Sequence, residues 1–418
     1  MVAFLQDAAA RRDARVIGVV AFAHGTSHFF HLLLPPLFPW LMHDFGLNFT
    51  QVGALMSIFF VISGTGQALA GFVVDRLGPR RVLLFGVGSL ALSGFTLAVA
   101  GNYAMLALAA GLAGLGNSVF HPVDFTILNR RVSQQRLGYA FSAHGLSGNL
   151  GWAVAPVFMA GIAALTNWHW AGLGAGLVAT SVLAVLIWQR ELLDVHDTAA
   201  HAAAQTKPAH VTSETFAFLG SSAVWLCFTF FFVTTLSLGV LQIFSPTLLN
   251  QLYGLSLAAA TSCLTAYFVG GAVGTVGGGF LAARGKSQDR VITAALTVSA
   301  TCALVIALGV LPGWCVIGLM AVLGMGVGLA GPSRDLLVRQ AATAGFGRDA
   351  FGRVYGFVYS GLDVGFAIAP LVFGPLMDHG HYSAVLSGVA VLQALAILSA
   401  LSVGMRARVT RRVAAGAG

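Results

Sequence analysis

Long apolar stretches alternate with short polar segments along the whole chain. Twelve stretches contain about 20 or more mainly apolar residues, and each is long enough to cross roughly 30 Å of hydrocarbon as a helix. They are Val16–Met42, Val52–Val74, Val82–Ala100, Tyr103–Leu128, Leu137–Leu165, Trp170–Trp188, Phe216–Leu249, Leu255–Leu281, Val291–Leu311, Trp314–Leu337, Val354–Met377 and Tyr382–Val403. The pattern predicts an all-α membrane protein with twelve transmembrane helices.

The composition supports this class. Hydrophobic residues make up 57% of the 418 residues and charged residues only 9%. A soluble domain carries roughly 25% charged residues, so the outer surface of this protein is expected to face lipid.

The position of the basic residues predicts an orientation. All 22 Lys and Arg residues lie before the first span, after an even-numbered span, or next to these segments, while the opposite loops have none. This asymmetry is the positive-inside pattern, and it predicts a multi-pass protein of the bacterial inner membrane with both termini in the cytoplasm. The net charge of +8 is not gathered into one basic block, so we expect no nucleic-acid partner.

Landmarks in the first half recur in the second at an offset of about 210 residues, which indicates an internal repeat. The matching pairs are Gly71 with Gly279, Pro122 with Pro332, and Gly151–Pro156 with Gly365–Pro370. We therefore predict an N-terminal six-helix bundle over residues 1–190, a cytoplasmic linker over 191–214 and a C-terminal six-helix bundle over 215–418. Two parallel repeats of this kind hold a solute site between them in one large class of transporters.

The turn after the second span, Gly71–Arg81, has the sequence GFVVDRLGPRR. It resembles the signature of the major facilitator superfamily at the same loop, and Gly78 suits a tight turn there. The resemblance implies two parallel six-helix repeats and a gating role for this turn, which would latch the two halves on the cytoplasmic side in the outward-open state. The residues that carry this gating motif are Gly71, Asp75, Arg76, Gly78, Arg80 and Arg81.

A second resemblance is narrower. The segment Gly114–Pro122, GLGNSVFHP, looks like the fourth span of the fosmidomycin-resistance branch of the superfamily, and parts of spans one and five are also similar. Membership of this branch implies proton-coupled export of drugs. The chain departs from the branch at His31, where the branch has an Asn-Asp pair nearby, and at Asp124, which follows Pro122 by two residues in place of an immediate Glu. Span four also lacks an arginine that many proton antiporters of the superfamily have.

Ionisable residues within spans are costly in lipid and usually face a cavity or a partner. In span one, His24, His28 and His31 lie four and three residues apart, hence on one helix face. Three interpretations fit this face: binding of protons or anionic substrate groups, coordination of a divalent metal, and hydrogen bonding to neighbouring helices. We assign no metal site and expect no cofactor.

Further polar residues occupy spans four, five, ten and eleven. His121 and Asp124 lie three residues apart and are expected to form a coupled pair. Alignment of the repeats at their prolines sets Asp124 opposite Arg334, so we predict that Asp124 takes up the proton and Arg334 attracts an anionic group or acts as a gate. The other candidates for the substrate and proton pathway are His144, Asn149, Asp335, Tyr355, Tyr359 and Asp363.

These features predict a secondary active transporter that works by alternating access. We expect proton coupling, a small polar or anionic organic substrate, contact with membrane lipid and a monomeric state. Efflux of a drug or toxic compound by antiport is the alternative within transport, and a transporter-like membrane sensor without flux is the rival class. An enzyme is not expected, because no nucleophile with a positioned base can be identified in the sequence.

Overall fold

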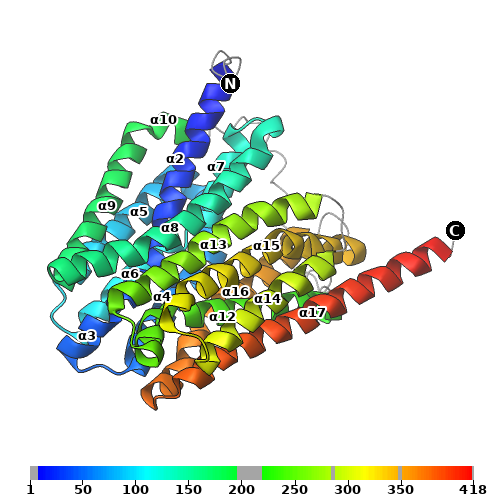
Figure 1. Cartoon of the computed structure of the whole chain (residues 1–418). Helices are drawn as coiled ribbons and strands as arrows, with labels where there is room; N and C mark the ends of the chain where they lie inside the picture. Colours follow the sequence, from blue (N-terminus) through cyan, green and yellow to red (C-terminus); the bar gives the residue numbers. More distant parts are fainter. Residues whose placement is uncertain (1–7, 195–218, 284–287, 347–350, 417–418) are drawn as a thin grey trace. The chain divides into compact units, whose positions relative to one another are not determined.

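The computed structural model describes residues 8–194, 219–283, 288–346 and 351–416, and within them the regular elements are all helices (Figure 1). The predicted linker over 191–214 lies outside the described residues from position 195 onward. The elements are α2 (Ala8–His31), η1 (Pro35–Leu37), α3 (Phe38–Phe45), α4 (Phe49–Leu77), α5 (Pro79–Ala98), α6 (Tyr103–Asn117), α7 (Phe120–Arg131), η2 (Gln134–Arg136), α8 (Leu137–Leu165), α9 (Trp168–Trp188), α10 (Arg190–Leu193), α12 (Ser222–Tyr253), α13 (Leu257–Ala283), α14 (Gln288–Leu308), η4 (Gly313–Cys315), α15 (Val316–Phe346), α16 (Phe351–Asp378) and α17 (Tyr382–Gly416).

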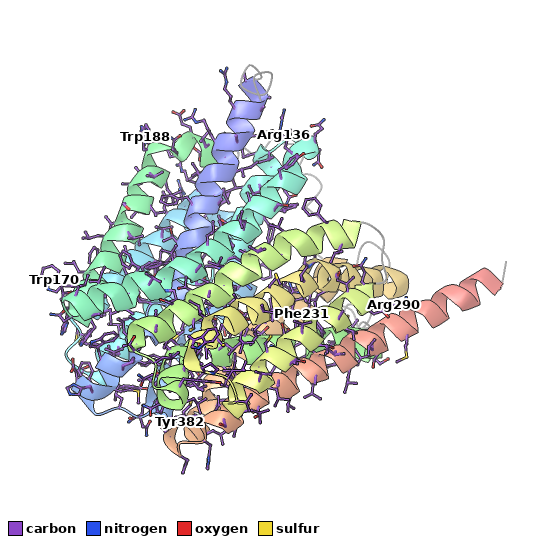
Figure 2. All side chains as sticks on the ribbon, viewed as in Figure 1. Arg136, Trp170, Trp188, Phe231, Arg290 and Tyr382 are labelled. Carbon is purple, nitrogen blue, oxygen red and sulfur yellow. The ribbon has the colours of Figure 1, made fainter. Side chains whose placement is uncertain are left out.

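The described part of the chain contains twelve segments that are long and apolar enough to cross a membrane. This confirms the predicted all-α class and the number of spans. Tryptophans mark both ends of one of them. Figure 2 shows Trp170 at one end of α9 and Trp188, on the same side as Arg136, at the other, and both indoles are exposed. Tryptophan is enriched where a helix passes through the membrane interface.

The first span is not one continuous helix, unlike the predicted Val16–Met42 stretch. Helix α2 ends at His31, and the chain continues through η1 into the short helix α3. The cause is the pair Pro35 and Pro36: proline lacks a backbone N–H, and it disfavours helical geometry at the residue before it. The break places His31 at the last position of α2.

The fourth span is also interrupted, between Asn117 and Phe120. Pro122 cannot donate a hydrogen bond to the carbonyl of Ser118, and its ring would crowd that carbonyl in a continuous helix. The span therefore consists of α6 and α7, and regular bonding resumes with Val123 N donating to Val119 O over 3.1 Å. His121 and Asp124 both lie on α7, directly after the break.

The chain forms two compact units. The first unit comprises Met1–Leu34 with Val61–Thr212, and the second comprises Pro35–Phe60 with Ser213–Gly418. The start of α4 belongs to the second unit, where Ser57 Oγ donates to the carbonyl of Ala367 over 2.8 Å and Phe60 stacks on Phe366. The predicted division into bundles 1–190 and 215–418 remains a prediction.

Helix packing repeats within the two units. In the first unit α2 packs on α8 and α5 on α9; in the second unit α12 packs on α16 and α14 on α17. Gly151 and Gly365, which the sequence repeat aligns, lie at the corresponding contacts. A Cβ at Gly151 would overlap the backbone carbonyl of Gly25 on α2, and a Cβ at Gly365 would lie 2.7 Å from the carbonyl oxygen of Phe232 on α12. The repeated glycines therefore allow equivalent helix pairs to approach closely.

We expect Asp378→Ala to destabilise the second unit by about 1 kcal/mol, as loss of a helix cap usually does. Asp378, the last residue of α16, accepts from Phe49 N at 2.6 Å and Thr50 N at 3.1 Å, the first two backbone amides of α4. A carboxylate there also complements the positive end of the helix dipole. Thermal unfolding of the purified protein measures the effect. Asp44→Ala is the control, since Asp44 is exposed and pairs with the adjacent His43; equal losses in both variants would contradict the capping role.

Candidate functional site: a histidine cluster in the first unit

Five histidines from three helices meet in the first unit. His24, His28 and His31 come from α2, His121 from α7 and His144 from α8, with ring-to-ring contacts linking them. We call these five residues the histidine cluster. The small residues at the contact between α2 and α8 make it possible, because they let the two helix backbones approach closely.

His24 connects α2 to a buried, hydrogen-bonded pair of side chains, Asp124 on α7 and His144 on α8. Its ring stacks on that of His144 with 3.5 Å between centroids, and its Nδ1 donates to the carbonyl oxygen of His144 over 2.9 Å. The Nε2 of His144 in turn donates to Oδ2 of Asp124 over 3.0 Å. Asp124 is completely buried, and its second oxygen Oδ1 has no hydrogen-bond partner among the described residues. A buried carboxyl with one oxygen that accepts no hydrogen bond is well placed to accept a proton.

His28 lies between His24 and Trp152. Its ring centroid is 4.4 Å from each of these two rings, and neither of its ring nitrogens makes a hydrogen bond of acceptable geometry within the described chain. A Cβ at Gly148 would lie 2.8 Å from the His28 ring and 3.0 Å from that of His24. Gly148 therefore provides the space in which both imidazoles fit.

His31 and His121 are held by amide side chains of other helices. The Nε2 of His31 donates to Oδ1 of Asn117 over 2.9 Å, and Asn117 Nδ2 donates to Ser63 Oγ over 2.7 Å. His121 Nδ1 lies 2.9 Å from Oε1 of Gln67 on α4. Because an amide oxygen only accepts, Nδ1 of His121 carries the proton in this arrangement.

The structure rearranges the pairs that the sequence predicted. The expected pair of His121 with Asp124 is not formed: Asp124 bonds to His144, and His121 bonds to Gln67. Proximity on one helix face does not decide which side chains meet, because the partners come from other helices, α4 for His121 and α8 for Asp124. Asn149 donates to the carbonyl of Gly145 on its own helix over 3.3 Å and does not join these bonds.

The polar candidates of the second unit form a separate group. The guanidinium of Arg334 lies 4.5 Å from the centre of the Phe231 ring, and the Tyr359 ring packs on Phe231 at 4.6 Å. Asp363 is partly buried one turn beyond Tyr359 on α16. The side chains of Asp335 and Tyr355 lie outside the described residues. Asp124 and Arg334 belong to different units, so their functional pairing remains a prediction.

The basic turn after α4 is described in part. Gly78 adopts φ +81°, which confirms the tight turn expected there. Arg80 forms an ion pair with Asp194 within its own unit, while Arg76 and Arg81 are exposed, as is Gly71. The side chain of Asp75 lies outside the described residues. The latch between the halves therefore stays a prediction.

Polar side chains near the start of α2 bond to other segments of the first unit. Asp13 accepts from Arg136 Nη1 over 3.0 Å and from Ser133 Oγ over 2.5 Å, which ties the start of α2 to the segment before α8. Arg15 donates to Gln189 over 2.7 Å. These bonds fix the first turns of the helix that carries His24, His28 and His31.

Sequence reasoning missed three partners of the histidine cluster, Gln67, Asn117 and Trp152, and it also missed Ser63, which bonds to Asn117. Two of them had a detectable signal. Gln67 is a long amide side chain in an otherwise apolar span, and Asn117 stands four residues before His121, although the helix break separates them. Ser63 and Trp152 carry no such signal, because serine and tryptophan are common in membrane helices for reasons of packing.

A bundle of membrane-spanning helices that holds ionisable groups in its interior is typical of membrane transporters. A sequence model of the Major Facilitator Superfamily matches residues 20–347. The chain therefore belongs to this superfamily of transporters, which confirms the resemblance seen at the turn Gly71–Arg81.

Individual relatives support this assignment. The chain is 32% identical over 179 residues to the fosmidomycin resistance protein of Escherichia coli, a match that covers 43% of this chain and 42% of that protein. It is 25% identical to the uncharacterized MFS-type transporter YfnC of Bacillus subtilis over 92% of both chains. Among solved structures, a bacterial homolog of the human lysosomal transporter Spinster has a similar fold, with a TM-score of 0.72 at 13% identity over 96% of this chain and 98% of the other.

Proposed function

We propose that this protein is a proton-coupled secondary transporter that moves a small polar or anionic organic solute across the bacterial inner membrane by alternating access. The observation that carries the proposal is the buried chain His24–His144–Asp124 inside a unit of a major facilitator transporter. The carboxyl of Asp124 is fully buried. Burying an ionisable group in a membrane protein is costly, so groups in such positions usually have a function.

Asp124 is the proton acceptor in this proposal. The hydrogen bond from His144 Nε2 holds one carboxyl oxygen, and the other oxygen remains open to a proton. Protonation removes the buried charge, and deprotonation restores it. Each state favours a different environment for the carboxyl, which is how a proton gradient can bias a conformational equilibrium.

The substrate assignment follows from the side chains available. In the first unit the histidine cluster provides hydrogen-bond donors, and in the second unit Arg334 provides a positive charge. Each of these suits a carboxylate, phosphonate or similar group. We also propose that both termini lie in the cytoplasm, which the distribution of the 22 basic residues supports. We further propose that the protein acts as a monomer, with small molecules, protons and lipid as its partners.

Drug efflux is the second candidate. Its support is the similarity to the fosmidomycin resistance protein, which extends over 43% of this chain and 42% of that protein. A sensor that binds a solute without transporting it is the rival class. The buried series of hydrogen bonds that ends at the carboxyl of Asp124 favours transport over sensing, because a sensor has no need for a proton acceptor.

Transport can be tested with purified protein in liposomes that contain a pH-sensitive dye. We expect that at least one member of a panel of organic anions and antibiotics, fosmidomycin included, causes solute-dependent proton movement. A thermal-shift screen selects the panel, because a bound ligand stabilises the folded protein by mass action. One outcome would contradict transport and favour the sensor: a solute raises the melting temperature, but it is not transported and causes no proton movement. Proton movement that depends on an antibiotic alone would favour the efflux candidate.

A further inference from the structure

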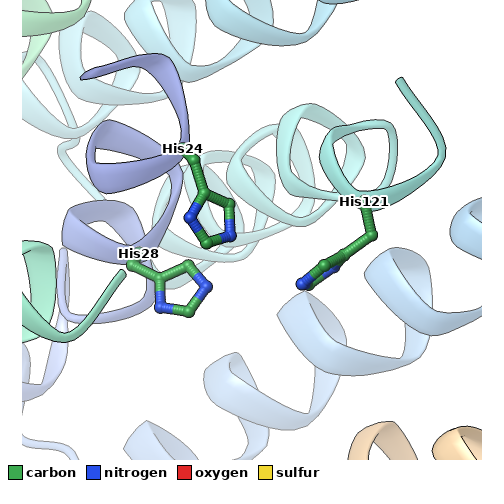
Figure 3. Close-up of side chains that lie close together, drawn as sticks. All are labelled: His24, His28 and His121. Carbon is green, nitrogen blue, oxygen red and sulfur yellow. The ribbon is translucent and has the colours of Figure 1, made fainter. Parts of the chain in front are cut away.

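We propose that His24, His28 and His121 form a binding site for one divalent transition-metal ion of the Zn²⁺ class. The ligand nitrogens of these residues all lie within 4.8 Å of one another. Figure 3 shows the three imidazoles converging on one space, two from α2 and one from α7. This set differs from the triad on one helix face that the spacing in span one suggested, because His121 takes the place of His31.

The hydrogen bonds of His24 and His121 prepare these two residues for coordination. His24 donates from Nδ1 to the carbonyl of His144, so in its neutral ring Nε2 carries the lone pair, and that nitrogen has no partner in the described chain. His121 is bonded from Nδ1 to Gln67, which likewise leaves the lone pair on Nε2. Metal-bound histidines commonly donate a hydrogen bond from their second ring nitrogen to a protein oxygen in this way.

His28 supplies the third ligand. Both of its ring nitrogens are buried without a hydrogen bond of acceptable geometry, and a polar atom left in that state costs free energy. A metal ion would satisfy one of them. Tetrahedral coordination at a metal–nitrogen distance of about 2.0–2.1 Å brings ligand nitrogens to about 3.4 Å from one another, so small rotations of the imidazoles complete the site.

A second group of potential ligands, His24, Asp124 and His144, is also within 4.8 Å. It is the weaker candidate, because His144 already donates to Asp124 and a metal would have to break that bond. Asp124 contributes in another way. Its carboxylate adds negative charge near His24, which lowers the cost of holding a divalent cation among neutral imidazoles.

The chemistry of the ligands selects the ion. Neutral imidazoles suit Zn²⁺, Co²⁺, Ni²⁺ and Cu²⁺, while Mg²⁺ and Ca²⁺ prefer oxygen ligands. His28 and His121 are partly exposed whereas His24 is buried. His24 is therefore the most enclosed of the three proposed ligands.

The experiment uses the full-length chain, purified in detergent with a tag that contains no histidine and treated with EDTA. Zn²⁺ binding is measured by titration calorimetry, and Co²⁺ binding by the visible absorption of tetrahedral cobalt. We expect one high-affinity ion per chain and no binding of Mg²⁺. His28→Gln and His121→Gln each remove a ligand and should weaken Zn²⁺ binding by about 100-fold. Gln67→Ala removes the side chain that orients the His121 ring, and it should weaken binding by about 10–100-fold.

Two further variants test the assignment. His379 and His381 are exposed, with ring centroids 6.3 Å apart, so the double variant His379→Gln/His381→Gln removes a surface pair and should leave the high-affinity site intact. His31→Gln should also retain it, since His31 is bonded to Asn117. Equal losses in the His31 and His28 variants, or binding that disappears with the surface pair alone, would overturn the proposal, as would absence of Zn²⁺ binding. The melting temperature of each metal-free variant shows that it is folded.

Discussion

Asp124→Asn is expected to abolish solute-dependent proton movement, lowering it to the level of empty liposomes. Asparagine has nearly the same shape as aspartate, and its amide oxygen can still accept the hydrogen bond from His144 that measures 3.0 Å in the native protein. It cannot take up a proton. The variant therefore separates the structural role of the side chain from its role in coupling, which the pH-sensitive dye measures directly.

Two comparisons make this result specific. Counterflow of labelled solute without a pH gradient should persist in Asp124→Asn, because solute binding and the movement of the units do not require proton uptake in that assay. Asp44→Asn, a change of the same chemistry at an exposed position, should behave as the native protein. Full gradient-driven transport by Asp124→Asn would rule out Asp124 as the proton acceptor and leave the coupling to another group.

The second large effect is expected for Gly151→Ala, which should destabilise the protein by about 1–3 kcal/mol or more, as overpacking usually does. The added methyl group would overlap the backbone carbonyl of Gly25 and approach the backbone N of Phe29 to 3.0 Å. Backbone atoms cannot rotate away as a flexible side chain can. Helix α8 must therefore move from α2, which separates His144 from His24. We expect a lower melting temperature and reduced transport.

Gly145→Ala is the matched control, because Gly145 lies on the same helix and a Cβ there would meet nothing within 4 Å. Alanine is also the better helix former, by about 1 kcal/mol in water. Its melting temperature should equal or exceed that of the native protein. A melting temperature of Gly151→Ala that matches that of Gly145→Ala would show that the close contact between α2 and α8 is not required.

Several features of the fold were accessible from the sequence because they depend on local composition. Apolar length determines which segments can cross a membrane, and twelve such segments are present in the described chain. The paired prolines at positions 35 and 36 and the single Pro122 were visible too, yet their consequence, two broken spans, was not predicted. Tertiary packing often tolerates proline within a membrane helix, as at Pro156 in α8 and Pro246 in α12.

The histidine cluster shows where sequence reasoning stopped. Spacing along α2 placed His24, His28 and His31 on one helix face, but it could not assign their partners, because those come from helices 86 or more residues away in the chain. In the structure, His24 pairs with His144 and His31 with Asn117, while His28 faces Trp152. The sequence by itself determined the membrane class and the presence of costly ionisable groups, since each is a local property. It also indicated the repeat, since a repeat is found by comparing one part of the sequence with another. Only the tertiary structure decided which groups meet, because that depends on the approach and register of helices, which glycines such as Gly148 and Gly151 set through contacts between distant segments.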